Sequence, residues 1–233
     1  MTNRIKSMPS YAQTVGIIEV LNEPQTSYND GGMPQQEKDT LTQKYYPQAL
    51  AAVRAAEGNI PDSQRLHVQF MDQLWGSGNP KSNLPSDSNI IFDDHNYVGN
   101  AVQAIHPGQT LKQADYMWYT CKVDNRLTDG DTPKIVQEFS LITNDQDSSE
   151  FTWHDAQGNP SATNAPFFKQ WFNAQQRLYE QTNGWIFWNW KTKNNDPRWD
   201  YSYLVSIGWV PPNQAGLDAS GAFDVCKSYF PNN

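Results

Sequence analysis

Two glutamates, Glu23 and Glu138, are the residues of this 233-residue chain whose types and positions best suit chemistry. Glu23 follows the β-forming run 16–22, and Glu138 follows the similar run 134–137. Two predicted strands therefore each end at a carboxylate. This pattern predicts that the two acids lie at the same end of a sheet. Two facing carboxylates are the minimal equipment for cleaving a glycosidic bond.

The elements that must position these acids alternate between strand and helix. Strands are predicted over the short β-rich runs 16–22, 66–70, 89–97, 134–139 and 184–190. Helices are predicted over 40–57 and 110–121, and from Asn164 to a stop at Gly184. Such alternation is typical of a parallel sheet covered by helices, in which active-site loops follow the C-terminal strand ends. The long polar loops 71–88 and 140–163 follow strands in this way.

Each predicted helix carries an apolar face. Tyr46, Leu50 and Val53 keep i, i+4, i+7 spacing in the first helix. Leu111, Ala114 and Trp118 share one face of the second. The third helix has the strongest stripe, formed by Phe167, Phe168, Trp171, Phe172, Leu178 and Tyr179. These faces predict the side on which each helix packs against the sheet.

Composition and charge argue against several classes of protein. The net charge is −8 without a basic cluster, so no nucleic-acid partner is expected. No apolar stretch approaches the roughly 20 residues that a membrane span requires, and the N-terminus lacks an apolar signal core. No cluster with metal-ligand spacing is found, so neither a metal nor a cofactor is expected. Nine tryptophans exceed the needs of a core and favour a groove lined by aromatic rings.

Polar and aromatic residues gather where the predicted strands end. They are Asn22 and Glu23, His95 and Tyr97, Glu138, and Trp188 with Trp190. Carboxylates could do chemistry on a sugar, amide and imidazole groups could bind its hydroxyls, and Trp could stack on its face. Each motif alone has a plainer interpretation as a turn, a cap, a packed histidine or a core tryptophan. Their joint occurrence in this order favours a sugar site.

At these residues the chain resembles glycoside hydrolase family 5, whose members are (β/α)8 barrels. The family places Asn-Glu, usually followed by Pro, at the end of its fourth strand and His-X-Tyr at the sixth. It places a Glu at the seventh strand and a Trp at the eighth. The matching residues here are Asn22, Glu23, His95, Tyr97, Glu138 and Trp188. The segments 184–193 and 199–201 look like those of fungal exo-β-1,3-glucanases, and the likeness runs over nearly the whole chain.

The resemblance implies hydrolysis of β-glucan or a β-glucoside with retention of configuration, β-1,3-glucan being favoured. Glu138 would be the nucleophile and Glu23 the acid/base. Among the implied substrate-binding residues, Asn22 would bind the sugar 2-hydroxyl and His95 would lie near the acid/base. Tyr97 would orient Glu138. Trp188 would lie beneath the sugar, and Trp190 is a weaker candidate for the same role. β-1,6-glucan, cellulose and other β-glucosides stay open, because leaving-group subsites sit on variable loops. The implied location is extracellular or in the cell wall, and no obligate protein partner is expected.

Two cysteines, Cys121 and Cys226, leave two alternatives open, namely free buried thiols or one long-range disulfide. The resemblance implies the disulfide, because in the exo-glucanases a cysteine after the sixth strand pairs with one near the C-terminus.

The matched motifs begin at the family's fourth strand, only about 20 residues into the chain. We therefore expect an α/β fold of (β/α)8 TIM-barrel type, truncated at its N-terminus to strands 4–8. Residues 1–233 would form a single partial catalytic domain. The rival hypothesis is a catalytically inactive fragment with residual glycan binding, because parallel strands without a closed barrel leave exposed edges.

Overall fold

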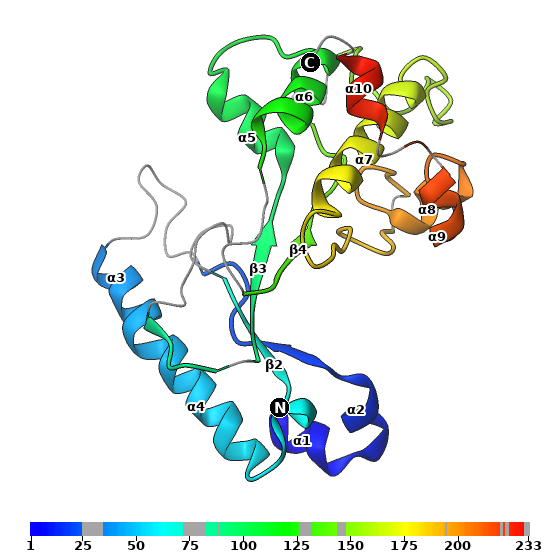
Figure 1. The fold of residues 1–233 in the computed structure, drawn as a ribbon. Coiled ribbons are helices and arrows are strands. Elements are labelled where there is room, and N and C mark those ends of the chain that lie inside the picture. Colours follow the sequence, from blue (N-terminus) through cyan, green and yellow to red (C-terminus); the bar gives the residue numbers. More distant parts are fainter. Residues whose placement is uncertain are drawn as a thin grey trace. The chain divides into compact units, whose positions relative to one another are not determined.

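A computed structural model describes residues 1–24, 35–71, 83–87, 89–125, 132–143, 148–193, 195–219, 221 and 224–230 (Figure 1). The chain divides into two compact units, Met1–His95 with Thr128–Ile135 and Asn96–Leu127 with Val136–Asn233. Parts of the predicted loops 71–88 and 140–163 lie outside the described residues. Within the described ranges, no helix has the length and hydropathy needed to cross a bilayer.

The first unit holds the strands predicted before residue 96. Its helices are α1 (Thr2–Ser7), α2 (Pro9–Thr14), α3 (Gln35–Thr40) and α4 (Tyr46–Glu57), and its strands are β1 (Ile17–Glu19), β2 (His67–Phe70) and β3 (Ile90–His95). β1 pairs parallel with β2, and β2 with β3, as the predicted strand–helix alternation requires. β4 (Lys134–Glu138) begins in this unit and completes a four-stranded sheet of order β1-β2-β3-β4.

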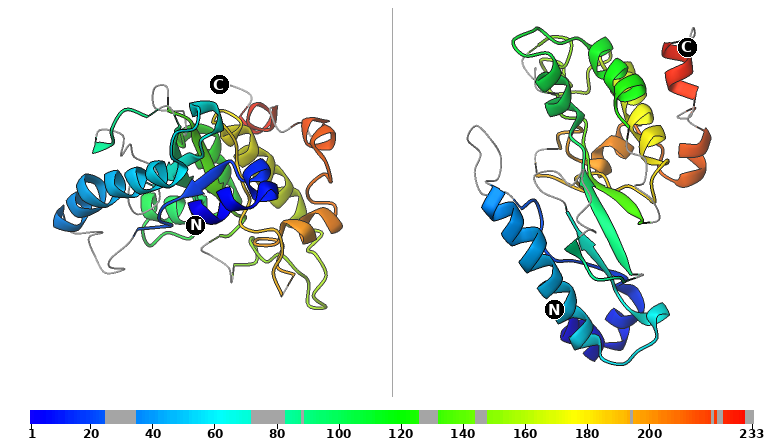
Figure 2. Two further views of the ribbon diagram at one scale, coloured as in Figure 1. Left: turned by 90° about the horizontal axis from the view of Figure 1, so that it is seen from below. Right: turned by 60° about the vertical axis from the view of Figure 1, so that its left-hand side comes forward.

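The helix predicted over 40–57 is longer than expected, since α3 runs through the π-helical turn Leu41–Tyr45 into α4. Figure 2 shows these segments as one rod running along the strands of the first unit. Its predicted apolar stripe is confirmed, because Tyr46, Leu50 and Val53 are all buried. They pack against the sheet side chains Val68, Phe70, Ile90 and Phe92.

The two faces of the sheet in the first unit carry different chemistry. Successive side chains of a strand point to opposite faces, so Phe70 and Phe92 contact α4 while their neighbours cannot. The strand register therefore leaves Glu19, Gln69 and Asp93 on the face turned away from α4. Gln69 and Asp93 are almost completely buried there.

The second unit is built around α7 (Ala165–Tyr179). It also contains the end of β4 and the helices α5 (Val98–Ile105), α6 (Gln113–Trp118), α8 (Tyr201–Ser206), α9 (Gln214–Ala219) and α10 (Val225–Tyr229). The predicted stripe of α7 is confirmed, because all six of its aromatic and aliphatic residues are buried. Phe139, the residue after Glu138, packs its ring 4.7 Å from Tyr179 and 5.2 Å from Phe187. The backbone that carries Glu138 is therefore anchored in the core of this unit.

The predicted apolar face of the 110–121 helix is wrong. The helix begins only at Gln113, because Asp115 and Lys112 cap its start reciprocally. Leu111 is buried but precedes the helix, and Trp118 is 41% exposed. Tyr116 and Met117 take the buried positions instead, so a spacing counted across the helix start gave the wrong phase.

The predicted strand 184–190 is also wrong as a strand. Only Trp185 forms a bridge, with Val136 of β4. The segment follows β4 as far as Trp188, whose N–H donates to the carbonyl of Phe139 at 2.8 Å. It then turns away, because the N–H of Asn189 donates to the carbonyl of Trp199. Four strands, rather than the expected five, form the sheet in the described residues.

The cysteines of the second unit are joined. Cys121 lies in the π-helical turn after α6, and Cys226 lies in α10. Their sulfur atoms form a disulfide that links positions 105 residues apart. This bond ties the last described helix to the segment after α6.

Replacing both cysteines with serine (C121S/C226S) should lower the free energy of unfolding of the second unit by about 2–5 kcal/mol, because a long cross-linked loop restricts the unfolded chain. Urea unfolding followed by tryptophan fluorescence measures the effect. The difference from the native chain should vanish when both are unfolded in reductant. Equal midpoints without reductant would contradict a stabilising bond.

Candidate active site

Glu23 lies just beyond β1 with an unusual backbone. Its φ angle is +41°, in the left-handed region that residues other than glycine seldom adopt. Its N–H donates to the sulfur of buried Met71 at 3.1 Å, and the Tyr46 hydroxyl donates to the carbonyl of Met71. The segment after β2 therefore holds Glu23 in this conformation. Non-glycine residues held in this region cluster at functional sites.

His95 connects Glu23 to a buried acid. Its Nδ1 lies 2.8 Å from Glu23 Oε1, and its Nε2 lies 3.2 Å from Asp93 Oδ2. The side chains of His95 and Asp93 are each 1% exposed, whereas that of Glu23 is 32% exposed. The imidazole thus bridges one carboxyl that reaches solvent and one that does not.

A second acid, the partly buried Glu19, lies next to Asp93. Burial, followed by the negative charge of Asp93 and a hydrogen bond with it, raises the pKa of Glu19 to about 8. His95 and the side chain of Gln69 act in the opposite direction and do not offset this rise. Glu19 is therefore protonated at neutral pH, since two adjacent carboxyls that are shielded from solvent cannot both ionise readily.

Glu138 ends β4 in the second unit and is mostly buried. The Tyr97 hydroxyl donates to Glu138 Oε2 at 2.6 Å, and the N–H of Asn96 donates to the Glu138 carbonyl at 2.8 Å. The ring of Tyr97 lies 5.7 Å from that of Trp199. Glu138 is therefore held at both its backbone and its side chain.

The predicted tryptophans lie on the segment that leaves β4. Trp188 is 45% exposed, and its backbone is hydrogen-bonded to Phe139 next to Glu138. Trp190 is 68% exposed and stacks on Tyr201, with ring centroids 6.1 Å apart. Both rings offer free surface, as a sugar platform needs.

Asp200 holds this tryptophan segment in place. Its carboxylate accepts hydrogen bonds from the backbone of Thr192 and Tyr203 and from the hydroxyls of Thr192 and Ser202. Burial pushes the pKa of Asp200 up, but these hydrogen bonds outweigh burial and hold that pKa below its usual 3.8. The carboxylate caps α8 and returns the chain from Thr192 to that helix.

The structure groups the predicted residues in two sets. Glu23 and His95 are in contact in the first unit, and Tyr97 and Glu138 are in contact in the second. The Asn22 side chain is exposed after β1. Sequence reasoning missed the parts played by Glu19, Asp93 and Trp199. Asp93 could have been found, because it lies two residues before His95 and so faces the same side of β3.

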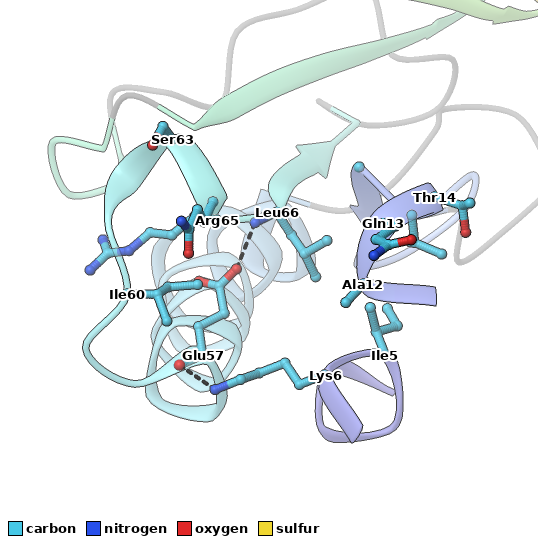
Figure 3. Close-up of a pocket in the computed structure, with 13 residues that line it drawn as sticks. Ile5, Lys6, Ala12, Gln13, Thr14, Glu57, Ile60, Ser63, Arg65 and Leu66 are labelled. Carbon is cyan, nitrogen blue, oxygen red and sulfur yellow. Dashed lines mark hydrogen bonds between the residues drawn. The ribbon is translucent and has the colours of Figure 1, made fainter. Parts of the chain in front are cut away.

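A cavity of about 560 Å³ lies elsewhere in the first unit (Figure 3). Its lining includes Gly16 and Leu66, which directly precede β1 and β2. Lys6 donates there to the carbonyl of Glu57, and the Glu57 carboxylate accepts the N–H of Leu66. The cavity is therefore at the N-terminal ends of the strands, whereas Glu23 follows the C-terminal end of β1.

Two solved structures share this fold. A rutinosidase from Aspergillus niger matches with a TM-score of 0.56 and 16% identity, over 88% of this chain and 55% of that one. A GH5-4 broad-specificity endoglucanase from Ruminococcus champanellensis, solved with cellotriose, matches with a TM-score of 0.50 and 16% identity, over 95% and 62%. At 16% identity these matches establish a shared fold alone. The fold of this chain is α/β with a parallel sheet, as in the barrel glycosidases.

Sequence relatives are more similar. The chain is 33% identical over 229 residues to the probable glucan endo-1,6-beta-glucosidase B of Aspergillus terreus, covering 97% of this chain and 50% of the relative. It is 24% identical over 232 residues to the glucan 1,3-beta-glucosidase 2 of Wickerhamomyces anomalus, covering 86% and 49%. The chain spans about half the length of these curated relatives. No protein-family profile matches it.

These matches confirm the resemblance to glycoside hydrolase family 5. The chain is a homologue of the fungal proteins named glucan β-glucosidases.

Stability should depend on pH through Asp200. Because its pKa is lowered on folding, its contribution is present above pH 4 and is lost as the pH falls through the lowered value. The variant Asp200→Asn should therefore be less stable than the native chain near pH 7, and the gap should narrow towards pH 3. Urea unfolding at both pH values measures this gap. Asp224→Asn, at a carboxylate with a 75% exposed side chain, is the control and should show little gap at either pH.

Proposed function

We propose that this chain carries the two catalytic carboxylates of a retaining glycoside hydrolase that acts on β-glucan. One observation supports this most directly: each glutamate contacts the partner that its motif predicts. Glu23 lies 2.8 Å from His95, and Glu138 accepts the Tyr97 hydroxyl at 2.6 Å. Three sequence relatives, each named as a glucan glucosidase, support the same class of reaction.

In the first step the Glu138 carboxylate attacks the anomeric carbon. The bond from that carbon to the leaving oxygen breaks, and Glu23 supplies the proton that this oxygen takes up. In the second step Glu23 removes a proton from water, whose oxygen attacks the same carbon and releases Glu138. Two inversions give retention. The Tyr97 hydroxyl orients Glu138, Asn22 binds the sugar 2-hydroxyl, and Trp188, with Trp190 beside it, supplies the aromatic surface.

The linkage is proposed to be β-1,6. Relatives named endo-1,6-β-glucosidase are 33–36% identical to this chain, whereas those named 1,3-β-glucosidase are 24–26% identical. The sequence motifs alone favoured β-1,3-glucan, which stays the second candidate because it rests on the segment 184–193. We propose an extracellular or cell-wall location, supported by the fungal glucanase relatives.

The chain is proposed to correspond to strands four to eight of a (β/α)8 barrel, as a single partial catalytic domain. The order of its motifs and the parallel sheet support this correspondence. An inactive glycan-binding fragment is the second candidate function, supported by the exposed rings of Trp188 and Trp190, which could stack on a sugar without hydrolysing it.

The substrate test compares soluble β-1,6-glucan, β-1,3-glucan and a cello-oligosaccharide. We expect reducing sugar to be released mainly from the β-1,6-linked polymer, and Glu138→Gln to abolish the release, because an amide cannot act as the nucleophile. Glu37→Gln, at an exposed position of α3, is the matched control. Full activity of Glu138→Gln would refute the assignment, and binding without hydrolysis by the native chain would support the inactive fragment.

Tyr97→Phe should lower kcat about 10- to 100-fold and change KM little, because the hydroxyl orients the nucleophile rather than holding the substrate. Initial rates over a range of glucan concentrations give both constants. Tyr11→Phe removes the hydroxyl of an exposed tyrosine on α2 and should leave both unchanged. An unaltered kcat for Tyr97→Phe would show that the 2.6 Å contact has no part in catalysis.

A further inference from the structure

Two carboxyls next to His95, the partly buried Glu19 and the buried Asp93, have no part in the mechanism above. Glu19 is on β1 and Asp93 is on β3, with β2 between them. Glu19 pairs with Gln69, and Gln69 pairs with Ile91. Asp93 is two residues beyond Ile91 and so faces the same side. The register of the sheet therefore turns both carboxyls toward one region on the face away from α4.

The hydrogen bonds of the two carboxyls indicate a shared proton. Glu19 Oε1 and Asp93 Oδ1 are buried and accept no hydrogen bond from an N–H or O–H of the described residues. A buried carboxyl oxygen without a donor is costly. A proton held between two carboxyls removes this cost, and it also prevents two like charges from meeting in a site of low polarity.

Asp93 links the carboxyl pair to His95. With the shared proton held by Glu19, the pair carries one negative charge, and Asp93 Oδ2 faces His95 Nε2 at 3.2 Å. A carboxylate there keeps a proton on Nε2 and leaves Nδ1 directed at Glu23 Oε1, 2.8 Å away. A carboxylate that fixes the tautomer and orientation of a working histidine is a recurrent arrangement in enzymes.

We propose that Glu19 and Asp93 are positioning residues for the acid/base Glu23, acting as a proton-sharing carboxyl pair that fixes His95 against it. This proposal rests on the proposed function. Asp93 contacts His95, and His95 contacts Glu23, so the pair acts on Glu23 through the imidazole. Among the described residues, the titratable groups that act on Glu19 are Asp93 and His95, and the amide of Gln69 is its further polar neighbour.

The kinetic test uses two aryl glycosides of the sugar that the chain hydrolyses. A 2,4-dinitrophenyl group leaves without protonation, whereas a phenyl group needs the proton of Glu23. Asp93→Asn should lower kcat/KM, which reports only the first step, at least about tenfold for the phenyl glycoside and less than about twofold for the dinitrophenyl glycoside. A purely structural role would lower both equally, and that result would overturn the proposal.

Variants of Glu19 test the shared proton. Glu19→Gln keeps an N–H that can donate to Asp93, whereas Glu19→Ala leaves Asp93 without this donor. The glutamine variant should therefore retain more activity on the phenyl glycoside than the alanine variant. Equal losses in the two variants would argue against a hydrogen-bonding role. Asp224→Asn, in an exposed ion pair, is the control for a change of charge.

A spectroscopic test does not depend on turnover. The ¹³C resonance of the Glu19 carboxyl, assigned by its absence in Glu19→Gln, should titrate near pH 8. In Asp93→Asn its midpoint should fall, because a negative neighbour is gone, yet stay above the ordinary 4.5, because burial remains. A native midpoint near 4.5 would overturn the shared proton. If the native chain hydrolyses nothing, the proposed function and the positioning role fail, and this titration alone decides whether the pair exists.

Discussion

The alternation of side chains across the parallel strands is the constraint on which the first unit depends. One face must be apolar, because it packs on α4, and Val68, Phe70 and Phe92 supply that face. The residues between them are then committed to the opposite face, whatever their chemistry. A strand that keeps Phe92 inside the helix interface must present Asp93 on the other side. Glu19 and Asp93 are therefore placed by the same periodicity that builds the core.

The second unit meets a different constraint. It must hold the carboxylate of Glu138 at the end of a strand, directly beside an apolar core. Phe139 is fixed among the rings of the core, and Glu138 immediately precedes it. The Trp188 segment hydrogen-bonds to the same point of the backbone. Packing thus fixes the backbone of Glu138, and Tyr97 fixes its side chain. Rigid support of this kind is what a nucleophile needs, because small displacements are costly in rate.

Those elements of the fold that depend on one local segment of sequence could be predicted. Four of the five strand positions were found, since short β-rich runs of hydrophobic residues are a local signal. The stripe of α7 was found for the same reason. The 184–190 segment was mispredicted because its hydrogen bonds beside β4 end at Trp188, and Phe187 is the apolar residue of this segment that is buried. The face of α6 was mispredicted because its start is decided by a cap between Lys112 and Asp115.

The site was predictable to the extent that its residues stand in family-like motifs. Glu23, His95, Tyr97 and Glu138 were all found in this way, and two contacts among them are present. The closeness of Glu19 and Asp93 was not predictable, because it depends on the register of the three strands β1, β2 and β3, and the two residues are 74 positions apart in sequence. The register of a sheet depends on contacts between strands, so the sequence pattern of a single strand does not determine it.

The free-energy cost of shielding Glu19 and Asp93 from water indicates that the pair serves a function other than stability. Buried polar clusters can often be replaced by apolar residues of similar size with no loss of stability, and sometimes with a gain. A site selected for stability alone would therefore favour leucine or methionine at these two positions. Here the acids instead lie behind a histidine that contacts an acid with an unusual backbone conformation. Strain and buried charge in one place are typical of a site shaped by chemistry at the expense of stability.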